Sequence, residues 1–186
     1  MRVSREQAGE NHERIVEAAA RLFREQGFDR VSVDAIMRDA GMTHGGFYGH
    51  FKSKDDLAAQ ALVHALERSA ERQGKHTGIT GVVSDYLSQR HCEDPGNGCA
   101  IAALGADIAR EGKRIRHGPT TYIRSQLDRF AGLLTGGTAA KRRKRAIATL
   151  AGMVGALTLA RAVDDPALSK EILAACRDIF GNSTEP

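Results

Sequence analysis

Residues 32–57 read SVDAIMRDAGMTHGGFYGHFKSKDDL and carry closely spaced helix-capping and helix-breaking residues. Ser32 can cap a short helix, Gly41 breaks that helix, and a second short segment follows over residues 43–50. The second segment carries three glycines, each of which costs a helix about 1 kcal/mol relative to Ala, so it must be held by its neighbours. Two short helices joined by a Gly-containing turn are typical of a helix-turn-helix module.

The flanking residues supply the other helices of such a module. Upstream, apolar residues recur with the spacing of one helix face from Ile15 to Phe23, and Gly27 is placed to end that helix. Residues 1–10 are polar and predict a mobile arm before it. Downstream, Ser53 opens a further helix, and Asp56 three residues later completes a capping-box pattern.

The rest of the chain predicts more helices and no strand. Helices are expected at 81–91, 99–112, 119–134, 139–161 and 167–180, with breaks at 95–98, 117–119, 135–138 and 164–166. Alternating patterns of strand length are missing from the sequence, so the predicted fold class is all-α with about nine helices. Five of the nine aromatic residues lie between positions 23 and 51, which indicates two regions with different packing.

Composition excludes several classes of protein. A hydrophobic fraction of 41% with 27% charged residues is ordinary for a globular chain and argues against disorder. Three cysteines are too few for a disulfide-stapled secreted fold, and the chain opens on no signal-peptide pattern. The longest apolar run, residues 146–160, is shorter than the roughly 20 residues of a membrane span. We therefore expect a cytoplasmic protein with no membrane partner.

The chain also lacks the familiar motifs of catalysis. It has no nucleophile elbow, phosphate-binding loop, dinucleotide fingerprint or paired-histidine zinc motif. We therefore expect no enzyme, no cofactor and no metal site. The net charge of +4 permits an acidic partner such as DNA without requiring one.

Residues 12–57 resemble the DNA-binding region of the TetR/AcrR (tetracycline-repressor-like) transcriptional regulators. The resemblance rests on Ser32, Ile36, Ala40-Gly41, Gly45, Tyr48, Phe51 and Lys54. It implies an N-terminal three-helix DNA-binding domain over residues 1–52 and a helical effector-binding and dimerisation domain over residues 53–186. It further implies a homodimeric regulator, most often a repressor, that binds a palindromic operator in double-stranded DNA and is released by a small-molecule effector.

The resemblance assigns roles to individual residues of the DNA-binding region. Thr43 and His44 would read base edges, whereas Ser32, Tyr48, His50 and Lys54 would contact phosphates. The bare backbone at Gly45 would permit close approach to the DNA. Three positions depart from the family pattern: Met37 replaces the usual Ala, and Gly46 and Gly49 replace larger residues. His44 can act as donor or acceptor, so the preferred base stays open.

The C-terminal helices would hold the effector and the dimer interface. The effector pocket is expected among the helices at 57–70, 81–91, 99–112 and 119–134. The scarcity of aromatic residues favours a small or aliphatic ligand over a flat aromatic cation. Its candidate walls are Leu62, Leu66, Tyr86, Cys99, Leu104, Tyr122 and Leu127.

The dimer interface is expected on the last two helices. Helix 139–161 is apolar nearly all round, so it must be buried on most sides, either against a symmetry mate with helix 167–180 or as a core helix of its own chain. The run KRRKR at 141–145 is interpreted as a solvated helix end, with the helix proper starting near Arg145, rather than as a nucleic-acid patch. The candidate interface residues are Leu150, Met153, Val154, Leu157, Leu168, Ile172 and Ile179.

Two other functions remain open at this stage. Cys99 is expected in the first turn of a helix, where a thiol becomes more reactive, so the same scaffold could sense electrophiles or oxidants with Cys92 as a resolving partner. The alternative is that Cys99 is a buried packing residue. Cys176 is expected on a buried helix face in either case. A function of another class is a dimeric all-α ligand carrier that does not bind DNA.

Overall fold

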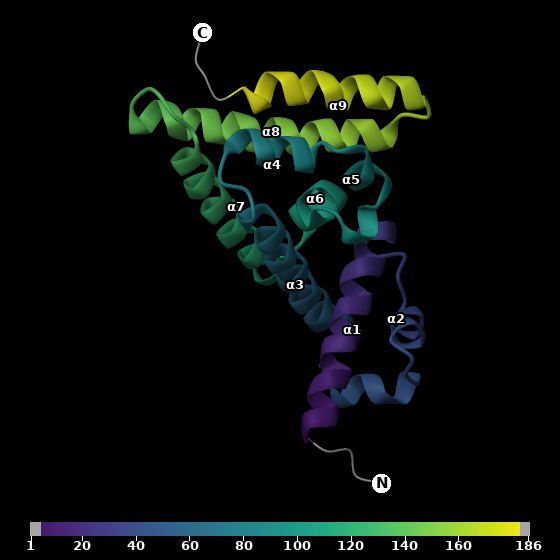
Figure 1. Ribbon diagram of the computed structural model, residues 1–186. Coiled ribbons are helices and arrows are strands. Elements are labelled where there is room, and N and C mark those ends of the chain that lie inside the picture. The colour runs from purple at the N-terminus through teal and green to yellow at the C-terminus, as the bar shows by residue number, and fades with distance from the viewer. Residues whose placement is uncertain (1–4, 183–186) are drawn as a thin grey trace.

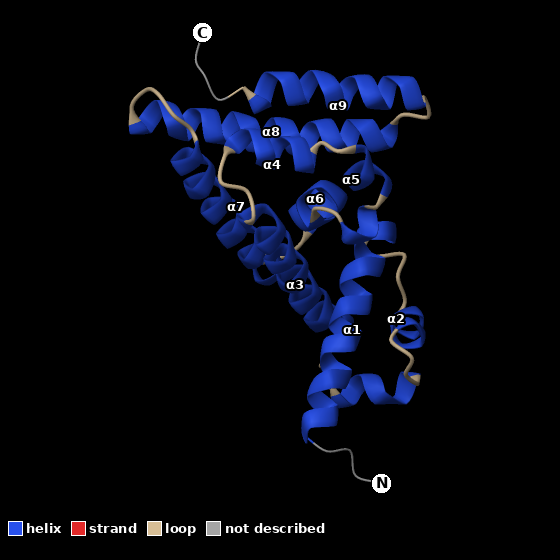
Figure 2. Cartoon of the chain, in the orientation of Figure 1, coloured by secondary structure: helices blue, strands red, loops and turns tan. Residues whose placement is uncertain are grey.

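The structure is a computed structural model that describes residues 5–182 and is all-α over that range, as predicted (Figure 2). It contains nine α-helices and two 3-10 helices. The first elements along the chain are α1 (Arg5–Gln26), α2 (Val33–Asp39), η1 (His44–Gly49) and α3 (Lys54–Gly74). The remaining elements are α4 (Ile79–Tyr86), α5 (Gln89–Glu93), η2 (Pro95–Asn97), α6 (Ala100–Arg110), α7 (Lys113–Leu133), α8 (Ala139–Ala162) and α9 (Pro166–Gly181).

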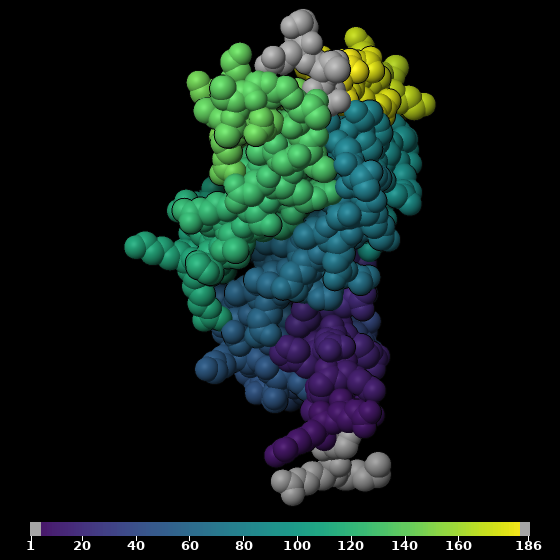
Figure 3. All heavy atoms as spheres, turned by 60° about the vertical axis from the view of Figure 1, so that its left-hand side comes forward, coloured from purple at the N-terminus to yellow at the C-terminus, as the bar shows by residue number. Residues whose placement is uncertain are grey.

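The molecule is elongated, with its two ends built from opposite ends of the chain. In Figure 1 the start of α1 lies with α2 and η1 at the bottom, and the hairpin of α8 and α9 lies at the top. The space-filling view in Figure 3 shows the same separation from another side. Between the ends, α3 packs against both α1 and α7. This places α3 in contact with the helix-turn-helix region and with the C-terminal bundle.

Most of the local signals at the helix ends are confirmed. Gly27 and Gly41 adopt φ angles of +84° and +71°, a left-handed conformation that favours glycine. The Ser32 hydroxyl accepts from the N–H of Ala35 at 3.1 Å, and the Ser53 hydroxyl accepts from the N–H of Asp56 at 3.1 Å. The capping box is altered in one respect, because the Asp56 carboxylate accepts from the N–H of Lys52 rather than that of Ser53.

Buried apolar residues form two clusters that do not divide at residue 52. The first cluster joins α1, α2, η1 and α3 to Ala100, Leu104 and Ile108 of α6 and to Ile115 and Tyr122 of α7. The second lies among α4, α7, α8 and α9. The domain boundary after residue 52 stays a prediction, and the first core extends across it.

Several predicted boundaries are wrong. Residues 5–10 belong to α1 and are not a mobile arm, since Glu, Gln and Arg are good helix formers. The break expected at 117–119 lies inside α7, which starts at Lys113 and includes Pro119. An ion pair of 2.7 Å between Arg114 and Asp56 joins this segment to α3, and Pro119 itself is buried, so packing overrides the local signal.

The segment from 81 to 98 is also divided differently from the prediction. The helix expected at 81–91 is split, because Ser88 caps a new helix, α5, by accepting from the N–H of His91 at 3.2 Å. The break expected at 95–98 contains η2, which Asp94 caps by accepting from the N–H of Asn97 at 3.1 Å.

The basic run at 141–145 lies inside α8, which starts at Ala139 with Thr138 as its cap. The helix therefore does not start near Arg145. Arg143 pairs with Asp128 at 2.5 Å, and Arg142 and Arg145 donate to carbonyls of the connection that precedes α8. By length and composition alone α8 could cross a membrane, which is weak evidence, since it also packs against α7 and α9 within the bundle.

Candidate DNA-binding surface and effector cavity

The segment after the turn is a 3-10 helix that presents its polar residues outward. Phe47 and Phe51 are buried, with their ring centroids 5.6 Å apart, and they anchor η1 on the first core. Next to them Tyr48 is 71% exposed. Thr43, which precedes η1, is exposed as well. Buried aromatic residues thus hold a short helix whose outer side is available to a partner.

His44 is oriented by a carboxylate from α2. Its Nδ1 lies 2.5 Å from Oδ1 of Asp34, and both side chains are more than half exposed. A carboxylate only accepts hydrogen bonds, so the Nδ1 of His44 carries the proton and donates it to Asp34. The other ring nitrogen, Nε2, is therefore the atom that can meet a base edge. The sequence pattern alone could not decide which ring nitrogen carries the proton.

The glycines of η1 leave a bare surface that internal packing does not require. A Cβ built at Gly45 or Gly49 would meet no atom within 4 Å. A Cβ at Gly46 would touch the end of Met37 at 3.6 Å, an ordinary contact distance, so the Met37 side chain lies beneath this glycine. Internal packing therefore does not require glycine at any of these three positions, although each glycine lowers the stability of the helix.

The other predicted DNA contacts flank η1. The exposed Ser32 uses its hydroxyl as the cap of α2, and Lys54 is the first residue of α3 and is half-buried. His50 is half-buried, with its ring centroid 6.1 Å from that of His12. The predicted contacts thus lie at the start of α2, along η1 and at the start of α3.

Comparison with known proteins identifies this region. Residues 15–61 match the family model of the bacterial regulatory proteins, tetR family. This stretch of the chain is therefore similar to the DNA-binding region of the tetR family. Curated relatives include HTH-type transcriptional regulators from several Staphylococcus aureus strains, 38% identical over 63 residues. That match covers 34% of this chain and 34% of each relative, so it spans about a third of their length.

Solved structures resemble this chain over nearly its whole length. A TetR-family transcriptional regulator from Cytophaga hutchinsonii superposes with a TM-score of 0.78 at 17% identity, covering 100% of both chains. A TetR transcriptional regulator from Chloroflexus aurantiacus gives 0.77 at 22% identity, covering 96% of this chain and 98% of that one. These likenesses show that the C-terminal helices share the fold.

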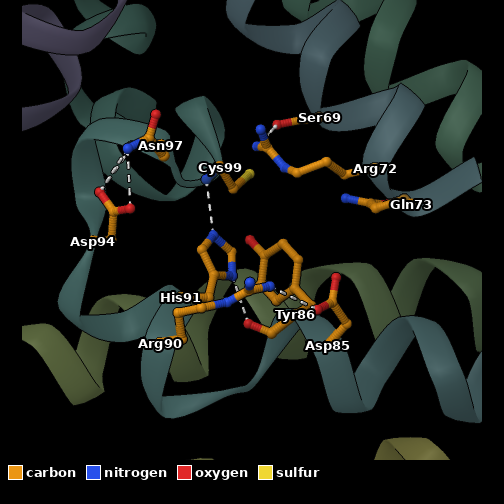
Figure 4. Close-up of a pocket in the computed structure, with 10 residues that line it drawn as sticks. All are labelled: Ser69, Arg72, Gln73, Asp85, Tyr86, Arg90, His91, Asp94, Asn97 and Cys99. Carbon is orange, nitrogen blue, oxygen red and sulfur yellow. Dashed lines mark hydrogen bonds and ion pairs between the residues drawn. The ribbon is translucent and has the colours of Figure 1, made fainter. Parts of the chain in front are cut away.

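A second candidate site is a cavity of about 190 Å³ between α3 and the α4–α6 segment (Figure 4). Helix α3 contributes Arg72 and Gln73, and α4 contributes Tyr86. Cys99, the N-cap of α6, lies opposite. Figure 4 shows Arg72 and the hydroxyl of Tyr86 both pointing toward Cys99, so polar groups from separate helices converge in one space.

Two polar atoms in the wall of this cavity are buried without a partner in the described part of the chain. They are the hydroxyl of Tyr86 and Oε1 of Gln73, whose residues are 4% and 7% exposed. Burial, and then the neighbouring Cys99, raise the pKa of Tyr86 well above its usual value, so the phenol stays protonated. An unpartnered buried polar atom costs free energy unless a water or ligand satisfies it.

His91 fixes the loop that closes the cavity. Its Nδ1 lies 2.6 Å from the carbonyl oxygen of Tyr86, and its Nε2 accepts from the N–H of Cys99 at 2.9 Å. Together these contacts require a neutral ring protonated at Nδ1. Burial is the main reason that the pKa of His91 lies below its usual value, and it is opposed by the carbonyl of Tyr86.

Only some of the predicted pocket residues line this cavity, and the others lie in the apolar cores. Tyr86 and Cys99 line the cavity. Leu62, Leu66, Leu104 and Tyr122 lie in the first core, and Leu127 packs against the second. Sequence periodicity found the apolar faces, but it missed Arg72, Gln73 and His91, since polar residues carry no such signal.

The environment of the cysteines differs from the prediction. Cys99 is the N-cap of α6 rather than part of its first turn, and it is only 4% exposed. Cys92 is also buried, with its Sγ 3.9 Å from the Ser169 hydroxyl. Cys176, expected on a buried face, is half-buried. This burial favours a packing role for Cys99 over that of an accessible thiol sensor.

The wall of the cavity is bonded directly to α1. Arg24 donates through Nε to the carbonyl oxygen of Gly96 in η2 at 2.7 Å. A Cβ at Gly96 would lie 3.0 Å from Cγ of Arg21 and would force the Glu25 carboxylate to move, so glycine favours this close approach. Burial, then repulsion by Arg72, lower the pKa of Arg24 to about 10. No local pattern predicts this contact, because it joins residues 72 positions apart.

The predicted dimer residues fall into two groups. Met153 and Leu157 are 0% exposed and belong to the second core, so their assignment to a dimer surface is wrong. Leu168 and Ile179 are exposed, whereas Leu150, Val154 and Ile172 are half-buried. Two exposed residues of α8, Ile147 and Leu159, were missed. Helix α8 is therefore buried on one side by its own chain and carries apolar side chains on another.

Within residues 5–182, no group of three or more His, Cys, Asp or Glu side chains is arranged to hold a metal ion.

Proposed function

We propose that this transcriptional regulator acts in the cytoplasm as a homodimeric repressor that binds a palindromic operator and leaves it when a small molecule binds. The observation that carries the proposal is the exposed set Thr43, His44 and Tyr48 on a 3-10 helix anchored by buried Phe47 and Phe51. A two-fold dimer would place two such surfaces on half-sites one helical turn, or a small multiple of it, apart.

The effector would act in the cavity between α3 and the α4–α6 segment. Two walls of that cavity lead to the DNA-binding region: α3, which packs on α1, and η2, whose Gly96 carbonyl is bonded to Arg24 of α1. A ligand that fits one arrangement of these walls better than the other would shift the tilt of α1 and the spacing of the two surfaces. It can do so only by its difference in affinity for the two states.

The test is a gel shift with DNA that flanks the protein's own gene, comparing a palindrome with a single half-site. We expect much tighter binding to the palindrome. Tyr48→Phe and Lys54→Ala should weaken binding to all operator variants alike, because phosphate contacts carry little sequence information. His44→Ala should relax the base preference instead.

Two outcomes would contradict the proposal. Equal affinity for a half-site and a palindrome would show that the protein does not read DNA as a dimer. Failure to bind any flanking fragment, with the fold intact by circular dichroism, would favour the function of a ligand carrier.

A further inference from the structure

The cavity between α3 and α4 carries an unbalanced positive charge. Arg72 donates from Nη2 to the neutral hydroxyl of Ser69 at 3.2 Å. Among residues 5–182, no carboxylate lies within 4.0 Å of its guanidinium, so this cation lacks an ionic partner in the described chain. A guanidinium offers five N–H donors, of which the Ser69 hydroxyl accepts only one.

The two acidic residues that border the cavity are already engaged elsewhere. Asp85 lies 3.5 Å from Nε2 of His76 and 3.4 Å from Nη2 of Arg90. Asp94 accepts from the backbone and side-chain N–H groups of Asn97, which hold its pKa below the usual value. Neither carboxylate therefore neutralises Arg72.

The buried polar atoms of the cavity can act as further donors. The hydroxyl of Tyr86 is protonated and unpartnered, so it can donate to a ligand. Gln73 is placed with its amide nitrogen 3.4 Å from the hydroxyl of Tyr122 and its oxygen unpartnered. If the side-chain amide of Gln73 turns over, its oxygen accepts from the hydroxyl of Tyr122 and an N–H is left free to donate to a ligand.

We propose that this cavity binds a small organic carboxylate, with one carboxylate oxygen on Arg72 and the other on the hydroxyl of Tyr86. A carboxylate accepts several hydrogen bonds and donates none, which matches a site of one cation and one or two free donors. The volume of about 190 Å³ is below the roughly 300 Å³ at which drug-sized pockets begin, so the ligand is small. This inference rests on the proposed effector role of the same cavity.

The experiment measures binding to the full chain, without DNA, by isothermal titration calorimetry. The probes are straight-chain carboxylates from propionate to octanoate and benzoate, each with its matched primary amide, together with hexylamine. We expect at least one carboxylate to bind at least tenfold more tightly than its amide, and hexylamine not to bind. Absence of binding by every carboxylate, or equal binding by the amides, would overturn the proposal.

Variants assign the binding to this cavity. Arg72→Gln should bring the carboxylate to the affinity of its amide, whereas Arg72→Lys should keep part of the preference because it keeps the charge. Tyr86→Phe should weaken the carboxylate severalfold while leaving the amide less affected. The matched control is Arg68→Gln, one turn earlier on α3, whose exposed side chain pairs with Glu71 at 3.7 Å and does not line this cavity. Loss of the preference in Arg68→Gln, or its survival in Arg72→Gln, would contradict the assignment.

The two proposals fail separately. Operator binding without ligand tests the regulator, and calorimetry without DNA tests the carboxylate site. A carboxylate that binds at Arg72 and leaves a working operator complex unchanged would support the site and contradict its effector role.

Discussion

The ring of His91 makes two hydrogen bonds to the backbone. Its Nδ1 donates to a carbonyl oxygen, and its Nε2 accepts from an N–H. Only the neutral ring satisfies both. Because its pKa in the folded chain lies below the usual value of about 6.5, the unfolded chain takes up a proton more readily than the folded one. We therefore expect the free energy of unfolding to fall as the pH drops below about 6.5. Above that pH, His91 is neutral in both states and should not change the free energy of unfolding.

The measurement is urea unfolding followed by circular dichroism between pH 7.5 and 5. His91→Gln should be less stable at neutral pH and should lose part of the pH dependence, since the replacement does not titrate. His117→Gln, at an exposed position, is the control and should keep the pH dependence of the native chain. The same slope in His91→Gln as in the native chain would show that another group causes the loss.

The proposed role of His44 in base reading would involve α2 as well, because Asp34 of α2 pairs with His44. Asp34 fixes the proton on Nδ1 of His44, so in the neutral ring Nε2 is an acceptor that suits the amino groups of cytosine or adenine. Asp34→Asn would remove the carboxylate that selects this form. We expect it to change the order of preference among operator variants, as His44→Ala does, although Asp34 itself need not touch DNA.

Gel shifts against a set of single-base operator variants measure this effect. Tyr48→Phe is the reference for a change that weakens all variants together. If Asp34→Asn lowers affinity uniformly, Asp34 acts through charge alone and does not orient His44.

At the level of the elements, α8 and α9 approach most closely at one glycine. A Cβ at Gly152 of α8 would collide with the ring of Phe180 of α9, whereas a Cβ at Gly155 would meet no atom within 4 Å. Gly155→Ala should stabilise the fold by up to about 1 kcal/mol through helix propensity. Gly152→Ala gains the same propensity but overpacks the contact at a cost of about 1–3 kcal/mol, so we expect it to be destabilising.

Denaturant unfolding of both variants at one protein concentration checks this prediction. The double variant Gly152→Ala with Phe180→Leu should recover part of the loss, because the smaller side chain makes room. Equal stabilisation by the two alanines would mean that the ring of Phe180 moves aside at no cost.

Helix ends were predictable where a side chain or a glycine determines them locally. Ser32, Ser53, Gly27 and Gly41 behave as their residue types indicate. The break expected around Pro119 failed because α7 is held there by contacts with a distant helix, which no local pattern reports. Exposed residues of the DNA-binding region could likewise be named from the sequence, whereas the partner of His44, ten positions earlier, could not.

On the scale of the whole molecule, the exposed apolar residues of α8 and α9 predict where a second copy docks. Leu159 is 58% exposed and Ile179 is 69% exposed. Charge in such a position is strongly disfavoured once it is buried between chains. We expect Leu159→Glu and Ile179→Glu to raise the dimer dissociation constant at least tenfold, measured by light scattering coupled to size-exclusion chromatography.

The control is Val63→Glu, because Val63 is an exposed apolar residue of α3, 41% exposed, away from α8 and α9. It should leave the dimer unchanged. A dimer that tolerates both glutamates would place the interface on another surface.

The cavity between α3 and the α4–α6 segment shows the limit of prediction at this scale. Helix periodicity predicts the apolar faces around the cavity. Its polar groups come from Arg72, Gln73 and Tyr86, which lie on two helices and meet only in the folded chain. A separation of 72 positions likewise hides the bond between Arg24 and Gly96.

That bond also limits how freely such proteins can be recombined. An engineer who exchanges the DNA-reading region for that of a relative, to redirect a sensor to a new promoter, replaces α1 along with it. The incoming helix must then offer an arginine where Arg24 stands and leave room for Gly96 beside Arg21, or the hybrid will bind its ligand and its DNA without connecting the two. Grafts that restore these contacts should switch, and grafts that omit them should stay constitutively bound or constitutively free.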